Sequence, residues 1–139
     1  MAIIYIVRHG RAAASFAEDL DPGLDDPGRQ QAHNACDVLM AHLPLKLVSS
    51  PLNRARETAQ PLRQQSGSEI QIEPRVAEIP SPGVTLAERG PWLREIMQGN
   101  WADQSAELQS WKQDLIEFLV GLDSDTAIFS HFIAINAAT

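Results

Sequence analysis

Short apolar runs alternate along the chain with segments that repeat their apolar residues at helical spacing. Ala2–Arg8 is a nearly continuous apolar run rich in β-branched residues, typical of a strand buried on both faces of a parallel sheet. Three further short strands are predicted, at Leu45–Ser49, Glu69–Glu73 and Thr126–Ser130. The helices predicted between them span Asp25–Leu43, Ser50 to Gly67, Thr85–Gln98 and Ser105–Leu122.

The predicted helices carry start signals and apolar stripes. Asp25 or Asp26 can cap the first helix before Pro27, and Ser50 followed by Pro51 reads as an N-cap and first helical residue. Cys36 falls on the apolar face of the first helix, where we expect an inert core thiol. The apolar stripe of the last of these helices comprises Leu108, Trp111, Leu115, Leu119 and Leu122.

Strand–helix alternation with short connections predicts a three-layer α/β sandwich around a mostly parallel, doubly wound sheet. We expect a single domain over residues 1–139, with no repeat or linker dividing it. A further helix begins at Ile133, and the sequence stops about two turns later at Thr139. We therefore expect the C-terminal end of the fold to be incomplete. Either the natural polypeptide continues, or a partner subunit covers the open edge, as in a homodimer.

Composition and charge narrow the function classes. The chain is 44% hydrophobic and 21% charged, as in a globular domain. Eleven Lys and Arg against eighteen Asp and Glu give a net charge of −7, which argues against nucleic acid or an anionic membrane as partner. The longest apolar run, Ile3–Val7, is far shorter than the roughly 20 residues of a membrane span. One cysteine cannot form an internal disulfide, and this favours a cytoplasmic location.

Residues suited to phosphate chemistry follow the predicted strands. His9 and Arg8 lie at the end of the first strand, Arg54 follows the second, Glu78 follows the third, and His131 follows the fourth. Ligands bind at the carboxyl ends of the strands in such sheets. Arginines bind phosphoryl oxygens, an imidazole can act as nucleophile, and a carboxylic acid can protonate a departing alkoxide.

These residues stand in motifs that resemble those of the histidine phosphatase superfamily, the phosphoglycerate mutase-like fold. Arg8-His9-Gly10 looks like its Arg-His-Gly signature, and Ser49–Ala59 (SSPLNRARETA) is similar to its second arginine motif. Leu24-x-x-x-Gly28-x-x-Gln31-Ala32, Val76-Ala77-Glu78-Ile79 and Ser130-His131 resemble its first-helix, acid and Ser-His segments. The similar segments follow the family's order over nearly the whole chain.

The resemblance implies a metal-independent phosphatase that needs no cofactor. His9 would be the nucleophile, Glu78 the general acid, and Arg8, Arg54 and His131 the phosphate ligands. The partner would be a small phosphorylated substrate, or a phosphoprotein carrying phosphohistidine. Two alternatives stay open: a catalytically weak module that binds or senses a phosphoryl ligand, suggested by Phe132 after the second histidine, and a phosphomutase.

Several neighbouring residues are assigned other roles. Arg56 cannot share the helix face of Arg54, so we expect a solvated arginine. Gly10 is expected in a tight turn that lets phosphate approach backbone N–H groups. Ser50 is expected to be a helix cap.

Glu73 is a second candidate for the general acid, and Glu78 is preferred because of its position in the motif that resembles the family's acid segment. His33 and His42 have no spacing that suggests a metal site.

Overall fold

The computed structural model describes residues 2–12, 23–77, 88, 91–92, 94–95 and 106–131. Within this part of the chain the strands are β1 (Ile4–Arg8), β2 (Lys46–Ser49), β3 (Ile70–Ile72) and β4 (Thr126–Ser130). The helices are α1 (Asp26–Met40), α2 (Asn53–Ser66) and α4 (Ala106–Val120), with a 3-10 turn, η1 (Pro74–Val76), after β3. Each strand begins and ends within two residues of its predicted position.

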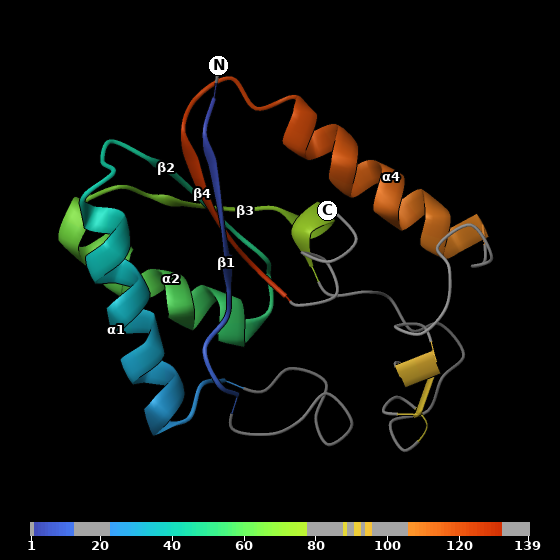
Figure 1. The fold of residues 1–139 in the computed structure, drawn as a ribbon, viewed down its shortest axis with the longest axis horizontal. Helices are drawn as coiled ribbons and strands as arrows, with labels where there is room; N and C mark the ends of the chain where they lie inside the picture. The colour runs from blue at the N-terminus through green and yellow to red at the C-terminus, as the bar shows by residue number, and fades with distance from the viewer. Residues whose placement is uncertain are drawn as a thin grey trace.

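The four strands form one parallel sheet in the order β1-β4-β2-β3 (Figure 1). β4, the last of the described strands in sequence, lies between the first two, with Val7 opposite Phe129 and Leu47 opposite Ala127. The carboxyl ends of β1, β4 and β2 are therefore neighbours at one edge of the sheet. The prediction of a mostly parallel sheet is confirmed.

Helices α1 and α2 cover one face of the sheet (Figure 1). Strand residues Leu47 and Phe129 pack there against Cys36 of α1 and Leu62 of α2, and all four are at most 2% exposed. The predicted core position of Cys36 is thus confirmed. Small residues on α2, among them Ala59, let the helix lie close to the sheet.

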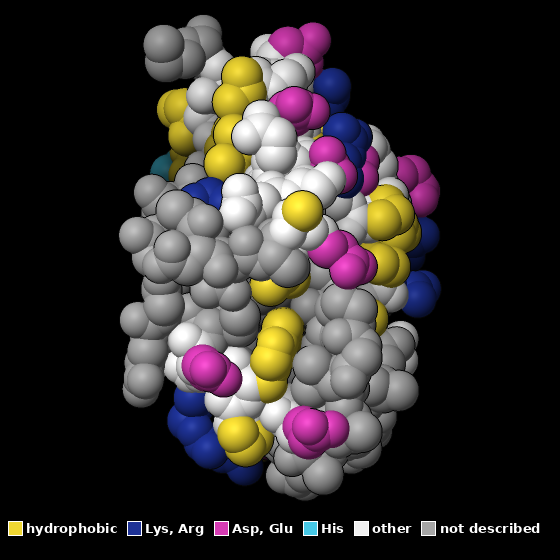
Figure 2. Space-filling model, turned by 90° about the vertical axis from the view of Figure 1, so that its right-hand side faces the viewer, with side chains coloured by type: hydrophobic (Ala, Val, Ile, Leu, Met, Phe, Trp, Pro, Cys, Tyr) yellow, Lys and Arg dark blue, Asp and Glu magenta, His cyan; other side chains and the backbone are white. Residues whose placement is uncertain are grey.

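Helix α4 and η1 cover the opposite face. Val48 and Ile128 directly follow residues that face α1 and α2, and they pack against Val76, Leu115 and Phe118. The alternation arises because successive strand side chains point to opposite faces. Helices on both faces confirm the three-layer, doubly wound fold. The side of the molecule that carries α4 shows acidic and basic side chains interspersed with apolar ones (Figure 2).

The start of α1 follows its predicted signal. Asp25 is the N-cap, and its carboxylate accepts a hydrogen bond from the N–H of Gly28 at 2.8 Å. Pro27 occupies the first turn, where its missing N–H costs nothing. The helix ends at Met40, three residues before the predicted Leu43.

The start of α2 differs from the prediction. The helix begins at Asn53, and the N-cap position belongs to Leu52, whose side chain makes no cap. Ser50 instead accepts a hydrogen bond from the N–H of Leu52 and contacts His131, so its hydroxyl serves a turn before the helix. At the other end, Gly67 adopts a left-handed conformation (φ 74°) that glycine tolerates best, as predicted for a helix stop.

Some predictions fall on residues that the structure does not describe. Glu78, the helix from Ile133 and the predicted C-terminal edge lie outside the described residues, as does most of the helix predicted over Thr85–Gln98. Among the described helices, none is long and apolar enough to cross a membrane.

Candidate functional site

Backbone hydrogen bonds between neighbouring strands fix the start of each functional loop. The N–H of His9 donates to the carbonyl of Ser130 at 3.0 Å, immediately after β1. The N–H of Ser50, immediately after β2, donates to the carbonyl of Phe129, also at 3.0 Å. These bonds bring His9, Ser50 and His131 to the same edge. The ring centroids of His9 and His131 lie 5.1 Å apart.

The hydrogen bonds of His9 define which ring nitrogen carries the proton. Nδ1 lies 2.7 Å from the carbonyl oxygen of Gly10, which can only accept. Nε2 accepts a hydrogen bond from Nε of Arg54 at 3.3 Å. Nδ1 is therefore protonated and Nε2 has a lone pair. This tautomer is the one in which Nε2 can act as a nucleophile.

Burial and nearby positive charge keep His9 neutral. Burial lowers its pKa most, and the charges of Arg54 and Arg8 lower it further; the hydrogen bond to Gly10 opposes them. The resulting pKa is about 4. At neutral pH the ring is therefore uncharged, with a lone pair on Nε2 that is able to attack.

The two arginines occupy different environments. Arg54, in the first turn of α2, is only 4% exposed and points its guanidinium at His9. Arg8 is exposed at the end of β1, close enough for its charge to act on His9. The structure thus brings both predicted phosphate ligands to the predicted nucleophile.

His131 is fully buried beside His9 and Arg54. Its Nε2 lies 2.7 Å from the hydroxyl oxygen of Ser50. Burial lowers the pKa of His131 to about 2, with further contributions from Arg54 and His9, so the ring is neutral. Sequence reasoning missed the contact with Ser50 because it assigned that serine to a helix cap.

The loop that carries His9 is held by tight backbone packing. Gly10 is buried, and a Cβ at this position would collide with the backbone of Gly28 in α1. The N–H of Gly10 donates to the hydroxyl of Thr58 at 2.9 Å. Gly10 does not have a positive φ. Glycine is needed here for the close approach of two backbones, and the expected approach of a phosphate to this turn stays a prediction.

Two further residues, from the segments that resemble the family's motifs, form hydrogen bonds that hold the loop of His9. The hydroxyl of Thr58 donates to the carbonyl of Arg54 at 2.7 Å, which links the His9 loop to α2. The side chain of Gln31 in α1 accepts a hydrogen bond from the N–H of Arg11 at 2.7 Å. From the sequence, no role was predicted for Thr58 or Gln31, although Thr58 lies in the second arginine motif and Gln31 in the first-helix motif.

The two candidate acids have different outcomes. Glu78 lies outside the described residues, so its position stays a prediction. Glu73 is described: its carboxylate accepts two hydrogen bonds from the guanidinium of Arg75, each at 2.9 Å. This pairing lowers the pKa of Glu73 although burial opposes it. Glu73 is ionised at neutral pH and holds no proton to donate to a leaving group.

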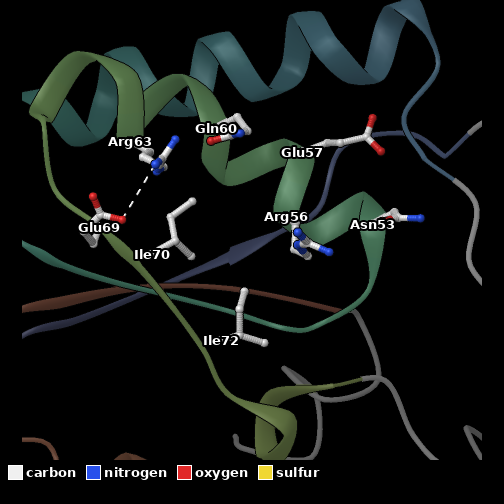
Figure 3. Close-up of a pocket in the computed structure, with 8 residues that line it drawn as sticks. All are labelled: Asn53, Arg56, Glu57, Gln60, Arg63, Glu69, Ile70 and Ile72. Carbon is white, nitrogen blue, oxygen red and sulfur yellow. Dashed lines mark ion pairs between the residues drawn. The ribbon is translucent and has the colours of Figure 1, made fainter.

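A cavity of about 430 Å³ lies away from this cluster, between the outer side of α2 and the edge strand β3 (Figure 3). Arg56 lines it, and Arg63 and Glu69 form an ion pair of 3.7 Å there. Arg56 is exposed, as expected for a solvated arginine. None of the predicted catalytic or phosphate-binding residues lines this cavity. Among the described residues, no group of three His, Cys, Asp or Glu could hold a metal ion.

Known proteins resemble this chain along most of its length. Glucosyl-3-phosphoglycerate phosphatase of Mycobacterium tuberculosis is 34% identical over 115 residues, which cover 80% of this chain and 48% of the relative. A probable phosphoglycerate mutase GpmB of Photorhabdus laumondii is 31% identical over 111 residues, covering 71% and 51%. The chain thus spans about half the length of these curated relatives.

A solved structure shows the same fold. The mycobacterial glucosyl-3-phosphoglycerate phosphatase in complex with VO3 superimposes with a TM-score of 0.74 at 24% identity, covering 96% of this chain and 77% of that chain. The model of the histidine phosphatase superfamily (branch 1) matches residues 4–126, from β1 to the start of β4. The chain belongs to the histidine phosphatase superfamily.

Proposed function

We propose that the protein is a metal-independent phosphatase that hydrolyses a phosphomonoester through a phosphohistidine on His9. The observation that carries this proposal is the hydrogen-bonded state of His9. Its Nδ1 proton is held by the carbonyl of Gly10, while its Nε2 lone pair faces the buried guanidinium of Arg54. A nucleophile and an oxyanion ligand are thereby in direct contact.

In the first step, Nε2 of His9 attacks phosphorus in line, and the bond from phosphorus to the ester oxygen breaks. Glu78 donates its proton to the departing alkoxide. Arg54 turns from Nε2 to the equatorial oxygens when the substrate binds, and Arg8 and His131 share those oxygens. The fixed donors stabilise the charge of the transition state.

In the second step, water attacks the phosphoryl group on His9. Glu78, now a carboxylate, takes a proton from that water, and the bond between phosphorus and Nε2 breaks. Inorganic phosphate leaves, and His9 returns to its neutral state. Glu78 recovers the proton that it donated in the first step, so the cycle closes.

The relatives suggest a substrate class. They are named as phosphatases of glucosyl-3-phosphoglycerate and as probable phosphoglycerate mutases, and both names include a phosphate ester of glycerate. We propose a small phosphomonoester of this type as substrate. The phosphomutase is the second candidate, favoured by the second group of names.

Phosphate release and phosphoryl transfer distinguish these functions. The purified protein would be given 3-phosphoglycerate, glucosyl-3-phosphoglycerate, protein phosphohistidine and an aryl phosphate, each with and without chelator. We expect free phosphate from at least one ester, at a rate that the chelator leaves unchanged. Formation of 2-phosphoglycerate without free phosphate would identify a mutase. Phosphate binding without either reaction would identify a binding module and contradict the proposal.

A further inference from the structure

Ser50 and His131 form a buried polar pair at the ends of β2 and β4. Both side chains belong to residues that are 0% exposed, and Oγ of Ser50 lies 2.7 Å from Nε2 of His131. Most buried polar side-chain atoms have at least one hydrogen-bond partner. The protons on the two side chains can therefore be assigned from their partners.

The hydroxyl of Ser50 has one proton to donate. Its oxygen already accepts a hydrogen bond from the N–H of Leu52 at 3.2 Å, and that N–H cannot accept. Within the part of the chain that the structure describes, the acceptor beside this hydroxyl is Nε2 of His131. Ser50 therefore donates to Nε2, which must carry a lone pair.

The other nitrogen of His131 then carries the proton. A neutral imidazole has one N–H, and with Nε2 unprotonated it lies on Nδ1. Nδ1 is buried and has no hydrogen-bond partner among the described residues. Leaving a buried donor unsatisfied destabilises the folded protein. Such a donor beside His9 and Arg54 needs an acceptor that a bound ligand can provide.

We propose that Ser50 is a positioning residue that fixes His131 as the Nδ1–H tautomer, so that the buried ring offers a neutral donor to a phosphoryl oxygen. The proposal rests on the phosphate-binding role proposed above for His131. With the opposite tautomer, a lone pair on Nδ1 would face the anion and repel it. Ser50 would then have to supply its own hydroxyl proton to the phosphate instead.

The tautomer can be measured in the protein without ligand. Nitrogen-15 chemical shifts of the imidazole rings distinguish protonated from unprotonated nitrogens, and the His131→Gln variant identifies which signals belong to His131. We expect the wild-type ring to be protonated at Nδ1 and unprotonated at Nε2. Protonation at Nε2 in the wild-type protein would overturn the proposal, without any variant and without any activity assay.

Ser50→Ala removes the donor to Nε2. We expect the His131 signals of this variant to show a mixture of tautomers. We expect its dissociation constant for inorganic phosphate or vanadate to rise by about twofold for an even mixture and about tenfold where only a tenth of the rings keep the Nδ1–H tautomer. Unchanged signals and unchanged affinity in a folded Ser50→Ala variant would contradict the proposal.

Ser49→Ala is the matched control. Ser49 is equally buried, but its hydroxyl donates to the carbonyl of Ser50 at 2.9 Å, whereas the hydroxyl of Ser50 is the one bonded to His131. We expect this variant to keep the wild-type tautomer and phosphate affinity. Failure of the wild-type protein to bind phosphate would refute the phosphate site, whereas the tautomer measurement would still decide the role of Ser50 on the ring.

Discussion

The hydroxyl of Thr58 accepts a hydrogen bond from the backbone N–H of Gly10, 48 residues earlier in the chain, at 2.9 Å. The same hydroxyl donates to the carbonyl of Arg54 at 2.7 Å, and Thr58 is 2% exposed. One buried oxygen thus connects the loop of the nucleophile to the helix of its arginine. Through its two hydrogen bonds Thr58 links the backbone next to His9 to the backbone of Arg54.

Replacing Thr58 by Val preserves its shape but removes both hydrogen bonds. We expect a loss of about 1–3 kcal/mol in the free energy of unfolding, because the N–H of Gly10 remains buried without a partner. We also expect a lower kcat, because His9 and Arg54 are no longer held together. Urea unfolding and steady-state kinetics measure the two effects. Thr58→Ser keeps the hydroxyl and should retain most of both properties; if it behaves like Thr58→Val, the hydroxyl is not the cause.

Replacing His9 by Ala removes the proposed nucleophile. We expect turnover to be abolished while vanadate binding persists, since Arg8, Arg54 and His131 remain. Rapid acid quench of the wild-type protein with labelled substrate should trap a phosphoenzyme that is stable in base and labile in acid, and the variant should give none. His33→Ala, on the exposed side of α1, is the control. A His9→Ala variant with near wild-type rates would contradict the mechanism.

The pH dependence of activity follows from the lowered pKa of His9, about 4. The ring is a nucleophile only when Nε2 is unprotonated, so the loss of kcat/KM on acidification should occur near pH 4. An ordinary histidine would lose activity near pH 6.5. A pH–rate profile on an activated aryl phosphate, whose leaving group needs no acid, measures this ionisation once the second ionisation of the phosphate ester itself, with a pKa of about 6, has been corrected for. A limb near pH 6.5 would show that the site does not shield His9.

The free energy of unfolding should decrease as the pH is lowered, because the pKa values of two buried histidines are lowered in the folded protein. His9 and His131 have folded-state pKa values of about 4 and about 2, below the unfolded value of about 6.5. Between pH 6.5 and 4 the unfolded chain binds protons that the folded chain does not. Each histidine therefore destabilises the fold by up to about 1.4 kcal/mol per pH unit as the pH decreases. Unfolding free energies at several pH values test this, and His9→Ala should reduce the slope.

The identity of the general acid can be tested by comparing substrates whose leaving groups differ in basicity. Glu78→Gln should slow esters with poor leaving groups by about 10²–10⁴-fold and activated aryl esters far less, because only a basic oxygen needs a proton. Glu73→Gln should affect both substrate classes alike, since the carboxylate of Glu73 is held by Arg75. The opposite pattern in the two variants would identify Glu73 as the acid.

The need for glycine at position 10 can be tested by adding a single methyl group there. In Gly10→Ala the new Cβ meets the backbone of Gly28, which has no side chain to move aside. We expect a loss of about 1–3 kcal/mol in the free energy of unfolding. Gly121→Ala is the control, because its Cβ would make ordinary contacts, 3.4 Å from the nearest atom. Equal stability of the two variants would contradict the close approach seen at Gly10.

Hydrophobic periodicity predicted the layers of the fold from local information. The apolar run of β1 (Ile4–Arg8) and the apolar stripe of α4 are each visible in a short stretch of sequence. Both elements lie where they were expected. The convergence of His9, Arg54 and His131 also followed, because parallel strands end at one edge of a sheet. Phe118, which packs with Leu115 in the core, was left out of the predicted stripe, although it lies three residues after Leu115 and seven after Trp111 and so shares their helix face.

Contacts between distant segments decided the rest. A serine before a proline has the same local pattern whether it caps a helix or bonds a histidine 81 residues away, and only the pairing of β2 with β4 brings Ser50 to His131. In the same way, the backbone of Gly28 makes Gly10 necessary, and Thr58 joins the loop of His9 to helix α2, 48 residues later in the chain. Local patterns specify the strands and helices, but the protonation and placement of the site's side chains depend on which elements fold against each other.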